Sequence, residues 1–513
     1  MPGPDGRQVA LPPSFRSLTM ASGVRAAMRR EPGKIAIVHG ERRRSYAELV
    51  HRIERITRAT VALGVKPGEN AAIVARNCIE YLELACGVPE AGVALATVNP
   101  RFTTAEIESI CNDAGARVVF VDAASAPLVR AARLTTAAQV IEIGPEFERW
   151  LESAPDSVPL PQVDEWDTWT IPYTSGTTGR PKGVMISHRS RALLALASAT
   201  DYGCFSPDDT FLAMAPMTYG GGLAFPVACL LHGASVDIMD RFEPEAVLRA
   251  LKHGGITGIF MVPTHFHQIF ALPPEVLERY RAPPIRTIIA NAAALPQAMK
   301  EKIVPYFGDD VLFEVYSSTE AGMVCSLRPP DQLRKHSCVG TPQAHTEVKI
   351  LAEDGRECAP DEVGELFSRS PYLFHGYWQR PEETAAAFRD GWVSVGDLAR
   401  RDGEGYLYIV DRKKDMVICG GVNIYPREIE EVLLTHPAIA DAAVIGVPDE
   451  QWGERLRAFV VLRAGAALTV DEMATCCASR LAAYKVPREL RCIDAMPRNA
   501  NGKILKTDLR KLA

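Results

Sequence analysis

The chain has 513 residues, of which 47% are hydrophobic and 23% charged, a composition typical of folded globular proteins. This length predicts two or more domains. With 57 basic and 63 acidic residues the formal net charge is −6, and no basic block occurs, which argues against a nucleic-acid-binding protein.

Export and membrane insertion are not indicated by the sequence. The first residues, MPGPDGRQVALPPSF, contain no apolar segment of the signal-peptide type, and no run of about 18 apolar residues occurs. The twelve cysteines form no C-x-x-C pair, so we expect reduced thiols in packing positions rather than disulfides or metal ligands. The sequence therefore predicts a soluble, cytoplasmic protein.

Short β-branched runs alternate with helical patterns between Lys34 and Asp122. IAIVHG, NAAIVA and RVVFVD are predicted strands, and Ser45 with Glu48 has the spacing of a capping box that opens a helix. Strands that lie one helix apart along the chain are typical of βα units on a parallel sheet. The predicted fold class is therefore α/β.

The rest of the chain divides into several stretches. The Pro- and acid-rich segment 146–167 shows little periodicity and is predicted to be a surface linker. Strands and helices then alternate to about Leu327, and short strands with turn signals over 348–410 predict a β-rich subdomain. A charged run follows at 411–415, where we expect a domain boundary because few contacts should cross such a run.

The segment YTSGTTGRPKGV, residues 173–184, carries the most specific chemical signal. It follows the apolar run WTIPY and supplies hydroxyls, glycine N–H groups and one lysine, a set suited to wrapping a polyphosphate. The order differs from the P-loop pattern G-x-x-x-x-G-K-[ST], because Lys182 precedes Gly183 rather than a hydroxyl residue. The alternative is a glycine-rich surface turn, which would need neither the lysine nor so many hydroxyls.

Three later clusters carry candidate polar groups. Glu320 ends the segment YSSTE after the strand VLFEV, where it could hold Mg²⁺ beside a phosphate or belong to a Ser/Thr-capped helix start. Asp397 lies in SVGDL and could accept both ribose hydroxyls or form an Asx-turn. Lys503 follows the glycine of PRNANGK, where an ordinary solvated lysine is the alternative.

Together, these segments resemble the adenylate-forming superfamily of acyl-CoA synthetases, adenylation domains and luciferases. The resemblance covers essentially the whole chain, and the motifs occur in family order: YTSGTTGRPKGV, APMTYGGG, NAAALP, YSSTEAG, SVGDLA, DRKKDMVICGGVNIYPREIE and PRNANGKILK. It implies a large N-terminal domain, residues 1–410, of α/β subdomains plus a β-rich subdomain. It further implies a hinge at 411–415 and a small, mobile α+β C-terminal cap domain at 416–513.

The resemblance also implies an ATP site. The phosphate-binding loop would comprise Thr174, Ser175, Gly176, Thr177, Thr178, Gly179 and Lys182. Thr319 would contact the α-phosphate, and Glu320 would hold Mg²⁺. The groups around the adenosine would be Tyr316 on the adenine face, the wall Ala292, Ala293 and Ala294, and, on the ribose, Asp397 and Arg412.

Two half-reactions follow from the same resemblance. In the first, Lys503 would bridge the attacking carboxylate and the α-phosphate, where a cation lowers the repulsion between two anions. In the second, the cap would rotate about Lys414 and bring new groups to the site. The residues implied in CoA binding are Gly420, Gly421, Trp452, Tyr484 and Lys485. For the last three side chains the alternative role is packing.

Two departures from the family pattern bear on the site. Tyr219 stands where a histidine usually gates the acyl pocket, and the following Gly220, Gly221 and Gly222 are expected to leave room beside it. This favours a bulky acyl group over acetate. Val395 replaces the usual threonine before Gly-Asp and removes a hydroxyl near the nucleotide.

The predicted function is an ATP- and Mg²⁺-dependent carboxylate:CoA ligase that acts through an acyl-adenylate on a medium-chain fatty or aromatic acid. Alternatives are an adenylating enzyme that loads a carrier protein, a luciferase-type oxygenase, and a nucleotide-binding regulatory protein without turnover. The presence of Lys503 favours turnover. His265 and His267 lack further ligands with metal-site spacing and are expected to line the pocket or pack. A monomer and a homodimer both remain open.

Overall fold

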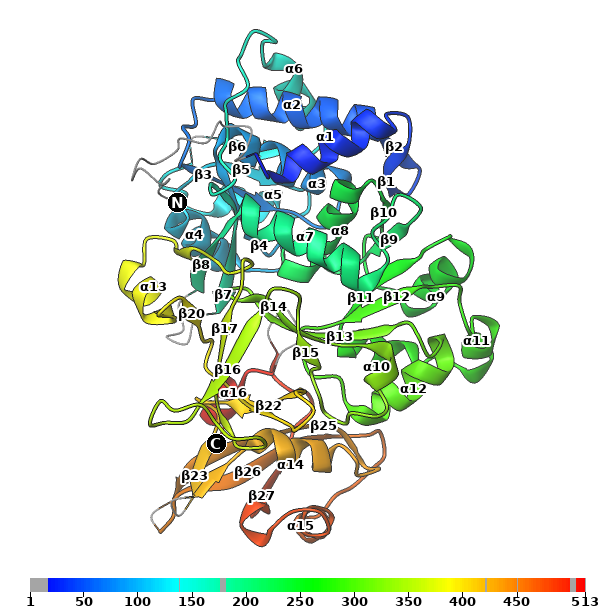
Figure 1. Cartoon of the computed structure of the whole chain (residues 1–513), viewed down its shortest axis with the longest axis vertical. Helices are drawn as coiled ribbons and strands as arrows, with labels where there is room; N and C mark the ends of the chain where they lie inside the picture. The colour runs from blue at the N-terminus through cyan, green and yellow to red at the C-terminus, as the bar shows by residue number, and fades with distance from the viewer. Residues whose placement is uncertain are drawn as a thin grey trace, which may run out of the picture.

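The computed structural model describes residues 17–137, 139–175, 181–419, 422–449, 451–498 and 504–512, without the side chain of Ser175. These residues form four β-sheets with flanking helices (Figure 1). In Figure 1, α14 (Pro426–Leu433) and α15 (Val470–Ala478) lie at one end of the molecule, and α1 (Met20–Arg30) and α2 (Tyr46–Ala62) lie at the other. No helix within these ranges combines the length and hydrophobicity needed to cross a bilayer.

The first sheet has seven strands in the order β18-β8-β7-β4-β3-β5-β6. Its strands are β3 (Asn70–Val74), β4 (Ala94–Val98), β5 (Ala116–Val121), β6 (Gln139–Glu142), β7 (Thr168–Ser175), β8 (Pro181–Ser187) and β18 (Gly376–Tyr377). β7, β4, β3, β5 and β6 run parallel, with α3 (Ile79–Gly87), α4 (Thr104–Asp113) and α5 (Ala126–Ala131) between them in the chain. The predicted parallel βα units are therefore confirmed.

The second sheet has nine strands in the order β15-β14-β13-β12-β11-β9-β10-β1-β2. Its strands are β1 (Ile35–His39), β2 (Arg42–Ser45), β9 (Thr210–Ala213), β10 (Ser235–Ile238), β11 (Gly258–Met261), β12 (Thr287–Ala290), β13 (Leu312–Ser318), β14 (Gly322–Leu327) and β15 (Thr341–Pro342). β1 does not join the first sheet as its sequence pattern suggests. It forms an antiparallel hairpin with β2, because Gly40 takes a positive φ of 59° at the turn, and pairs in parallel with β10.

The third and fourth sheets follow in the chain. The six-stranded sheet contains β16 (Glu347–Leu351), β17 (Gly364–Arg369), β19 (Phe388–Arg389), β20 (Trp392–Val393), β21 (Asp397–Arg401) and β22 (Leu407–Arg412). The β-rich texture predicted from about residue 348 is thus confirmed. The five-stranded sheet contains β23 (Val417–Cys419), β24 (Val422–Ile424), β25 (Ile439–Asp449), β26 (Gly453–Leu462) and β27 (Glu489–Cys492).

The helices confirm one prediction and correct another. Ser45 and Glu48 make the predicted capping box at the start of α2. The segment predicted as a linker instead begins as α6 (Pro145–Ser153), whose Phe147 and Trp150 pack on Phe120 with ring centroids 6.3 and 5.2 Å away. The remaining helices are α7 (His188–Tyr202), α8 (Gly220–His232), α9 (Pro244–His253), α10 (Pro263–Ile269), α11 (Pro274–Arg279), α12 (Gln297–Phe307), α13 (Pro381–Ala387) and α16 (Lys506–Lys511).

Candidate active site

Some of the predicted site residues, Ala292–Ala294, Tyr316, Thr319 and Glu320, lie at or just beyond the carboxyl ends of β12 and β13, the edge where α/β sheets usually bind ligands. Asn291, directly after β12, connects the ends of β11, β12 and β13. Its backbone N–H donates to Met261 O at 3.2 Å, and its side-chain amide donates to Ser317 Oγ at 2.8 Å. Ala292, Ala293 and Ala294 follow and are exposed at this edge.

Tyr316, Asp397 and Arg412, predicted to surround the adenosine, lie in contact. The Tyr316 hydroxyl donates to Asp397 Oδ2 at 2.5 Å, and Arg412 Nε lies 3.2 Å from Asp397 Oδ1. Asp397 and Arg412 face each other in the register of β21 and β22, which explains their proximity. Burial, and then the Asp397 charge, hold the pKa of the Tyr316 phenol well above its usual value, so the hydroxyl stays protonated and donates.

The two ends of the predicted phosphate loop lie side by side, because β7 and β8 pair in antiparallel orientation with Thr174 opposite Lys182. Gly183 sits where a Cβ atom would approach Ile171 Cγ2 to 2.7 Å, so only glycine fits this close strand packing. The intervening candidates Gly176, Thr177, Thr178 and Gly179 lie outside the described residues, as does the Ser175 side chain.

Lys182 and Glu320 are linked through Tyr377. The Lys182 ammonium lies 5.2 Å from the centroid of the Tyr377 ring and 2.8 Å from Glu383 Oε2. The Tyr377 hydroxyl donates to Glu320 Oε1 at 3.1 Å. Glu320 Oε2 has no hydrogen-bond partner among the residues that the structure describes. One oxygen of this carboxylate is therefore available to a cation.

Thr319 and Glu320 occupy the tight connection between β13 and β14 rather than a helix start, so the helix-cap alternative is wrong. Ser318 Oγ accepts from Ala321 N at 2.8 Å, and Phe374 N donates to Glu320 O at 2.8 Å. Arg191 on α7 donates from Nη2 to Thr319 O at 3.1 Å. Arg191 could not be predicted from the sequence, because no local motif connects α7 to this turn.

Tyr219 is the residue before α8, and its oxygen accepts from Asn99 Nδ2 at 2.6 Å. Burial raises the pKa of this phenol to about 12. The expectation that all three following glycines leave room is wrong. A Cβ atom at Gly221 would lie 2.9 Å from the Phe260 ring, and one at Gly222 would lie 2.1 Å from Pro216 O. Only Gly220 faces open space, with no atom within 4 Å of such a Cβ.

The two histidines of α10 differ in their surroundings. The His265 ring stacks on Phe242 with centroids 4.3 Å apart, and burial lowers its pKa to about 4. This neutral, stacked ring is a packing residue, as predicted. Partial burial also lowers the pKa of His267, although the charge of Asp441 on β25 opposes this shift.

The chain passes from the third sheet to the fourth over the exposed turn around Lys414. Asp415 N and Met416 N donate to Arg412 O at 2.9 and 3.1 Å, which closes the turn. Nearby, Arg427 N donates to Asp411 Oδ2 at 3.1 Å. The residues beside Lys414 make further contacts, since Lys413 N donates to Gly396 O at 2.9 Å and Asp415 Oδ1 lies 3.1 Å from Arg510 Nη2.

The structure describes three of the five residues predicted to bind CoA. Trp452 and Tyr484 are 41% and 52% exposed. Trp452 directly precedes β26, and Tyr484 lies in the short 3-10 turn before β27, which pairs in parallel with β26. Lys485 Nζ is not free, since it lies 2.6 Å from Glu428 Oε2. Gly420, Gly421 and Lys503 lie outside the described residues.

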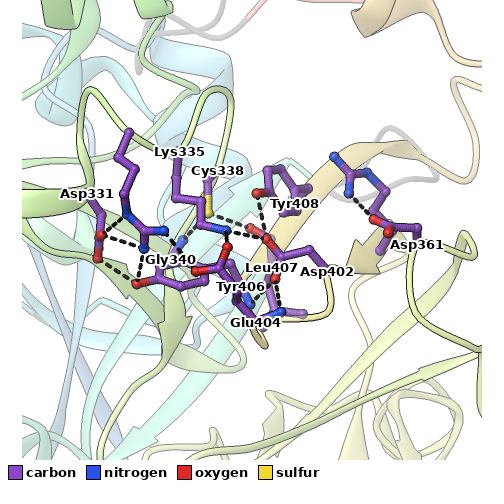
Figure 2. A network of polar contacts seen from close by, with 12 residues as sticks. Asp331, Lys335, Cys338, Gly340, Asp361, Asp402, Glu404, Tyr406, Leu407 and Tyr408 are labelled. Carbon is purple, nitrogen blue, oxygen red and sulfur yellow. Dashed lines mark hydrogen bonds and ion pairs between the residues drawn. The ribbon is translucent and has the colours of Figure 1, made fainter.

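A polar network braces the β21–β22 hairpin from the loop before β15 (Figure 2). Lys335 Nζ lies 2.8 Å from Asp402 Oδ2 and 2.6 Å from Glu404 Oε1. The lysine and its neighbours lower the pKa of Asp402 to about 2, although partial burial opposes them. The same loop reaches α14 through Ser337 Oγ, which donates to Glu431 Oε2 at 3.0 Å. The network thus connects the strands of Asp397 and Arg412 to the fourth sheet.

Comparisons with known proteins identify the family of the chain. The pattern of the AMP-binding enzyme family matches residues 24–378, and that of the AMP-binding enzyme C-terminal domain matches residues 428–503. Feruloyl-CoA synthase from an Amycolatopsis species is 35% identical over 491 residues, 94% of this chain and 96% of that relative. 2-Succinylbenzoate–CoA ligase from Geobacillus kaustophilus is 34% identical over 487 residues, 94% of this chain and 95% of that relative.

Solved structures give the same result. ATP-bound MatB from Rhodopseudomonas palustris has a TM-score of 0.88 and 29% identity, over 96% of this chain and 98% of that one. The predicted resemblance to adenylate-forming enzymes and the predicted fold class are thereby confirmed. The chain belongs to the AMP-binding enzyme family, among its AMP-forming acid–thiol ligases.

Proposed function

We propose that this protein uses ATP and Mg²⁺ to join a medium-chain fatty or aromatic acid to CoA through an acyl-adenylate. The observation that carries the proposal is that Tyr316 and Glu320 come from one short segment, the end of β13 and the turn that follows it. Tyr316 contacts the Asp397–Arg412 pair. Glu320 accepts a hydrogen bond from Tyr377, and the Lys182 ammonium lies over the ring of this tyrosine. Four residues span at most about 14 Å, so a single nucleotide can reach both groups.

In the first half-reaction, the substrate carboxylate attacks the α-phosphorus in line with the departing pyrophosphate. We assign Lys503 to the space between the carboxylate and the α-phosphate, Thr319 to the α-phosphate, and Lys182 to the leaving phosphates. Mg²⁺ fits the free oxygen of Glu320, since this ion prefers one or two carboxylates together with substrate oxygens. When bound, it neutralises charge on the phosphates.

In the second half-reaction, the CoA thiol attacks the acyl carbon and AMP leaves. The exposure of Trp452 and Tyr484 supports a stacking role for these rings. Gly420 and Gly421 are proposed to move into the site when the cap rotates. Lys485 must release Glu428 before it can pair with a CoA phosphate, so we expect its contribution to be small.

The substrate class rests on Tyr219 and on the relatives. The acids named for two of them, ferulic and 2-succinylbenzoic acid, are aromatic. Tyr219 is fixed by Asn99, and open space beside Gly220 leaves room for a large acyl group. Thioester formation with CoA should therefore be assayed with acetate, straight-chain fatty acids, benzoates and cinnamates. Acetate as the best substrate contradicts this proposal, and adenylation without transfer to CoA indicates a carrier-protein acceptor instead.

Shortening Tyr219 tests the position of the acyl pocket. Tyr219→Ala removes the ring but keeps the start of α8, so the size preference should shift toward larger acids while the KM for ATP changes less than about twofold. Each additional buried methylene contributes about 0.8 kcal/mol. The measurement is kcat/KM for an acid series with both proteins. An unchanged size preference would place Tyr219 outside the pocket.

A proline at the turn tests the pivot. Proline fixes its own φ near roughly −65° and restricts the preceding residue, so Lys414→Pro should hinder rotation between the two poses of the cap. We expect acyl-CoA formation to fall and the two half-reactions to be affected unequally, by at least about tenfold or 1.4 kcal/mol. Lys414→Ala, which leaves φ free, is the matched control and should resemble the wild type. Equal effects of proline on both half-reactions would mean that the cap does not pivot there.

A further inference from the structure

A small internal cavity lies between α7, α8 and β14. Its lining includes Arg191, Ser198, Ala224 and Met323, and its volume is about 10 Å³. This is room for about one water molecule or one oxygen-sized group. The cavity is mostly apolar, and the guanidinium of Arg191 is the charged group in its lining.

The cavity lies beside the face of α8 that Gly220 also occupies. Ala224 lies four residues after Gly220 on α8, so both residues face the same side of the helix. No atom lies within 4 Å of a Cβ placed on the exposed Gly220, and Ala224, one helical turn further along α8, lines the cavity. Met323, on the opposite wall, follows Glu320 by three residues on β14. If the acyl group lies beside Tyr219 and Gly220, as proposed, a long chain that follows this face of α8 would bring its far end toward the cavity.

Arg191 is an unusual residue for this position. It is 8% exposed, and no carboxylate lies within ion-pair distance of it among the described residues. Its guanidinium donates to Tyr372 O at 3.0 Å, to Thr319 O at 3.1 Å and weakly to Ser190 Oγ at 3.5 Å. Because a guanidinium has five N–H donors, these bonds leave donor capacity unused. Burial lowers the pKa of Arg191 to about 10, which still leaves it charged at neutral pH.

We propose that Arg191 is a specificity residue that binds an oxygen acceptor at the far end of the acyl group. The preferred acids would then carry a second oxygen function, a ketone or a carboxylate, remote from the carboxylate that is activated. The charge of Glu320 favours the Arg191 cation, but no carboxylate pairs directly with it among the described residues, so an acceptor in the cavity would offset part of the cost of burial. The inference rests on the proposed function, because the acid must first be the substrate of adenylation.

The bonds from Arg191 to Thr319 O and Tyr372 O suggest a second role, as a support for the turn that carries Glu320. The two roles have different consequences. Loss of a support slows adenylation of every acid alike, whereas loss of an acceptor site changes the ratio between acids that differ only in the remote oxygen. The ratio is therefore the informative quantity.

The test uses the full-length protein with octanoate, 7-oxooctanoate and suberate, and with 3-phenylpropanoate and its 4-acetyl derivative. Carboxylate-dependent exchange of labelled pyrophosphate into ATP gives kcat/KM for each acid. We expect the wild type to prefer at least one oxygen-bearing acid over its plain partner by tenfold or more. Arg191→Met should reduce this ratio to below about twofold, and Arg191→Lys should keep part of it. Comparison of the oxo acid with the dicarboxylate shows which oxygen function is bound.

The outcomes are distinguishable. A wild type that adenylates the plain acids without preferring any oxygen-bearing partner overturns this inference and leaves the proposed function intact. If Arg191→Met slows the adenylation of all acids equally, this inference is also overturned and the proposed function stays intact. Arg191 would then only support the turn that carries Glu320. If Arg191→Met does not fold, the wild-type ratios and the ratios measured with Arg191→Lys still test the inference. Failure of every acid to support exchange contradicts the proposed function itself, and this inference with it.

Discussion

Replacing Lys503 with alanine is expected to slow acyl-adenylate formation by about 10²- to 10³-fold and to leave the transfer of a preformed acyl-adenylate to CoA nearly unchanged. The magnitude is that of losing one preorganised charge-stabilising group at a developing negative charge. The expected asymmetry follows from the role assigned to Lys503, which acts while the two anions approach each other. Pyrophosphate exchange reports the first step, and synthetic acyl-AMP with CoA reports the second.

The control for this experiment is Lys511→Ala. Lys511 is an exposed lysine on α16 whose one ion pair among the described residues is with the neighbouring Asp508, at 2.6 Å, and its loss should change neither half-reaction. If Lys503→Ala slows both half-reactions equally, Lys503 does not separate the two steps, and the assignment of this residue to the α-phosphate is wrong.

Lys300→Met should be the most destabilising of the proposed substitutions, by about 3–5 kcal/mol. Lys300 on α12 forms an ion pair with Glu314 on β13, and both side chains are buried. Glu314 Oε1 also accepts from Leu295 N at 3.2 Å, directly after the Ala292–Ala294 segment. Without the lysine, a buried carboxylate stays unpaired next to two strand ends of the site. Urea denaturation followed by tryptophan fluorescence measures the loss.

The double variant Lys300→Met with Glu314→Gln separates charge from packing. It removes both charges, so it should recover a large part of the stability lost in Lys300→Met, because removal of one partner is worse than removal of both. A double variant that is no more stable than Lys300→Met would show that shape, rather than the unpaired charge, determines the loss.

Local patterns predicted the parts of the fold that depend on neighbouring residues. The α2 capping box and the parallel strands β3 to β6 could be predicted because their signals are short-range. The segment that forms α6 was wrongly predicted to be a linker. Acidic residues and prolines surround Phe147, Trp150 and Leu151 and obscure their helical spacing. The sheet of β1 was also wrongly predicted, because a strand pattern does not say which sheet the strand joins.

The site residues also divide into those that sequence motifs predict and those that depend on contacts between distant parts of the chain. Tyr316, Asp397 and Arg412 could be proposed from ordered motifs, and the structure brings them together through strand register. The packing of Gly221 and Gly222 could not be foreseen, since Phe260 and Pro216 fill the space beside them through tertiary contacts. Arg191 was missed for a related reason: its partners Thr319 and Tyr372 are far away in the chain.

The most direct test of the account is the carboxylate dependence of pyrophosphate–ATP exchange by the purified protein with Mg²⁺. The account predicts no exchange without an added acid, exchange with a medium-chain or aromatic acid, and conversion of that acid to its CoA thioester with AMP when CoA is supplied. Release of ADP instead of AMP, or exchange that does not depend on any carboxylic acid, would contradict the formation of an acyl-adenylate at the Tyr316–Glu320 site.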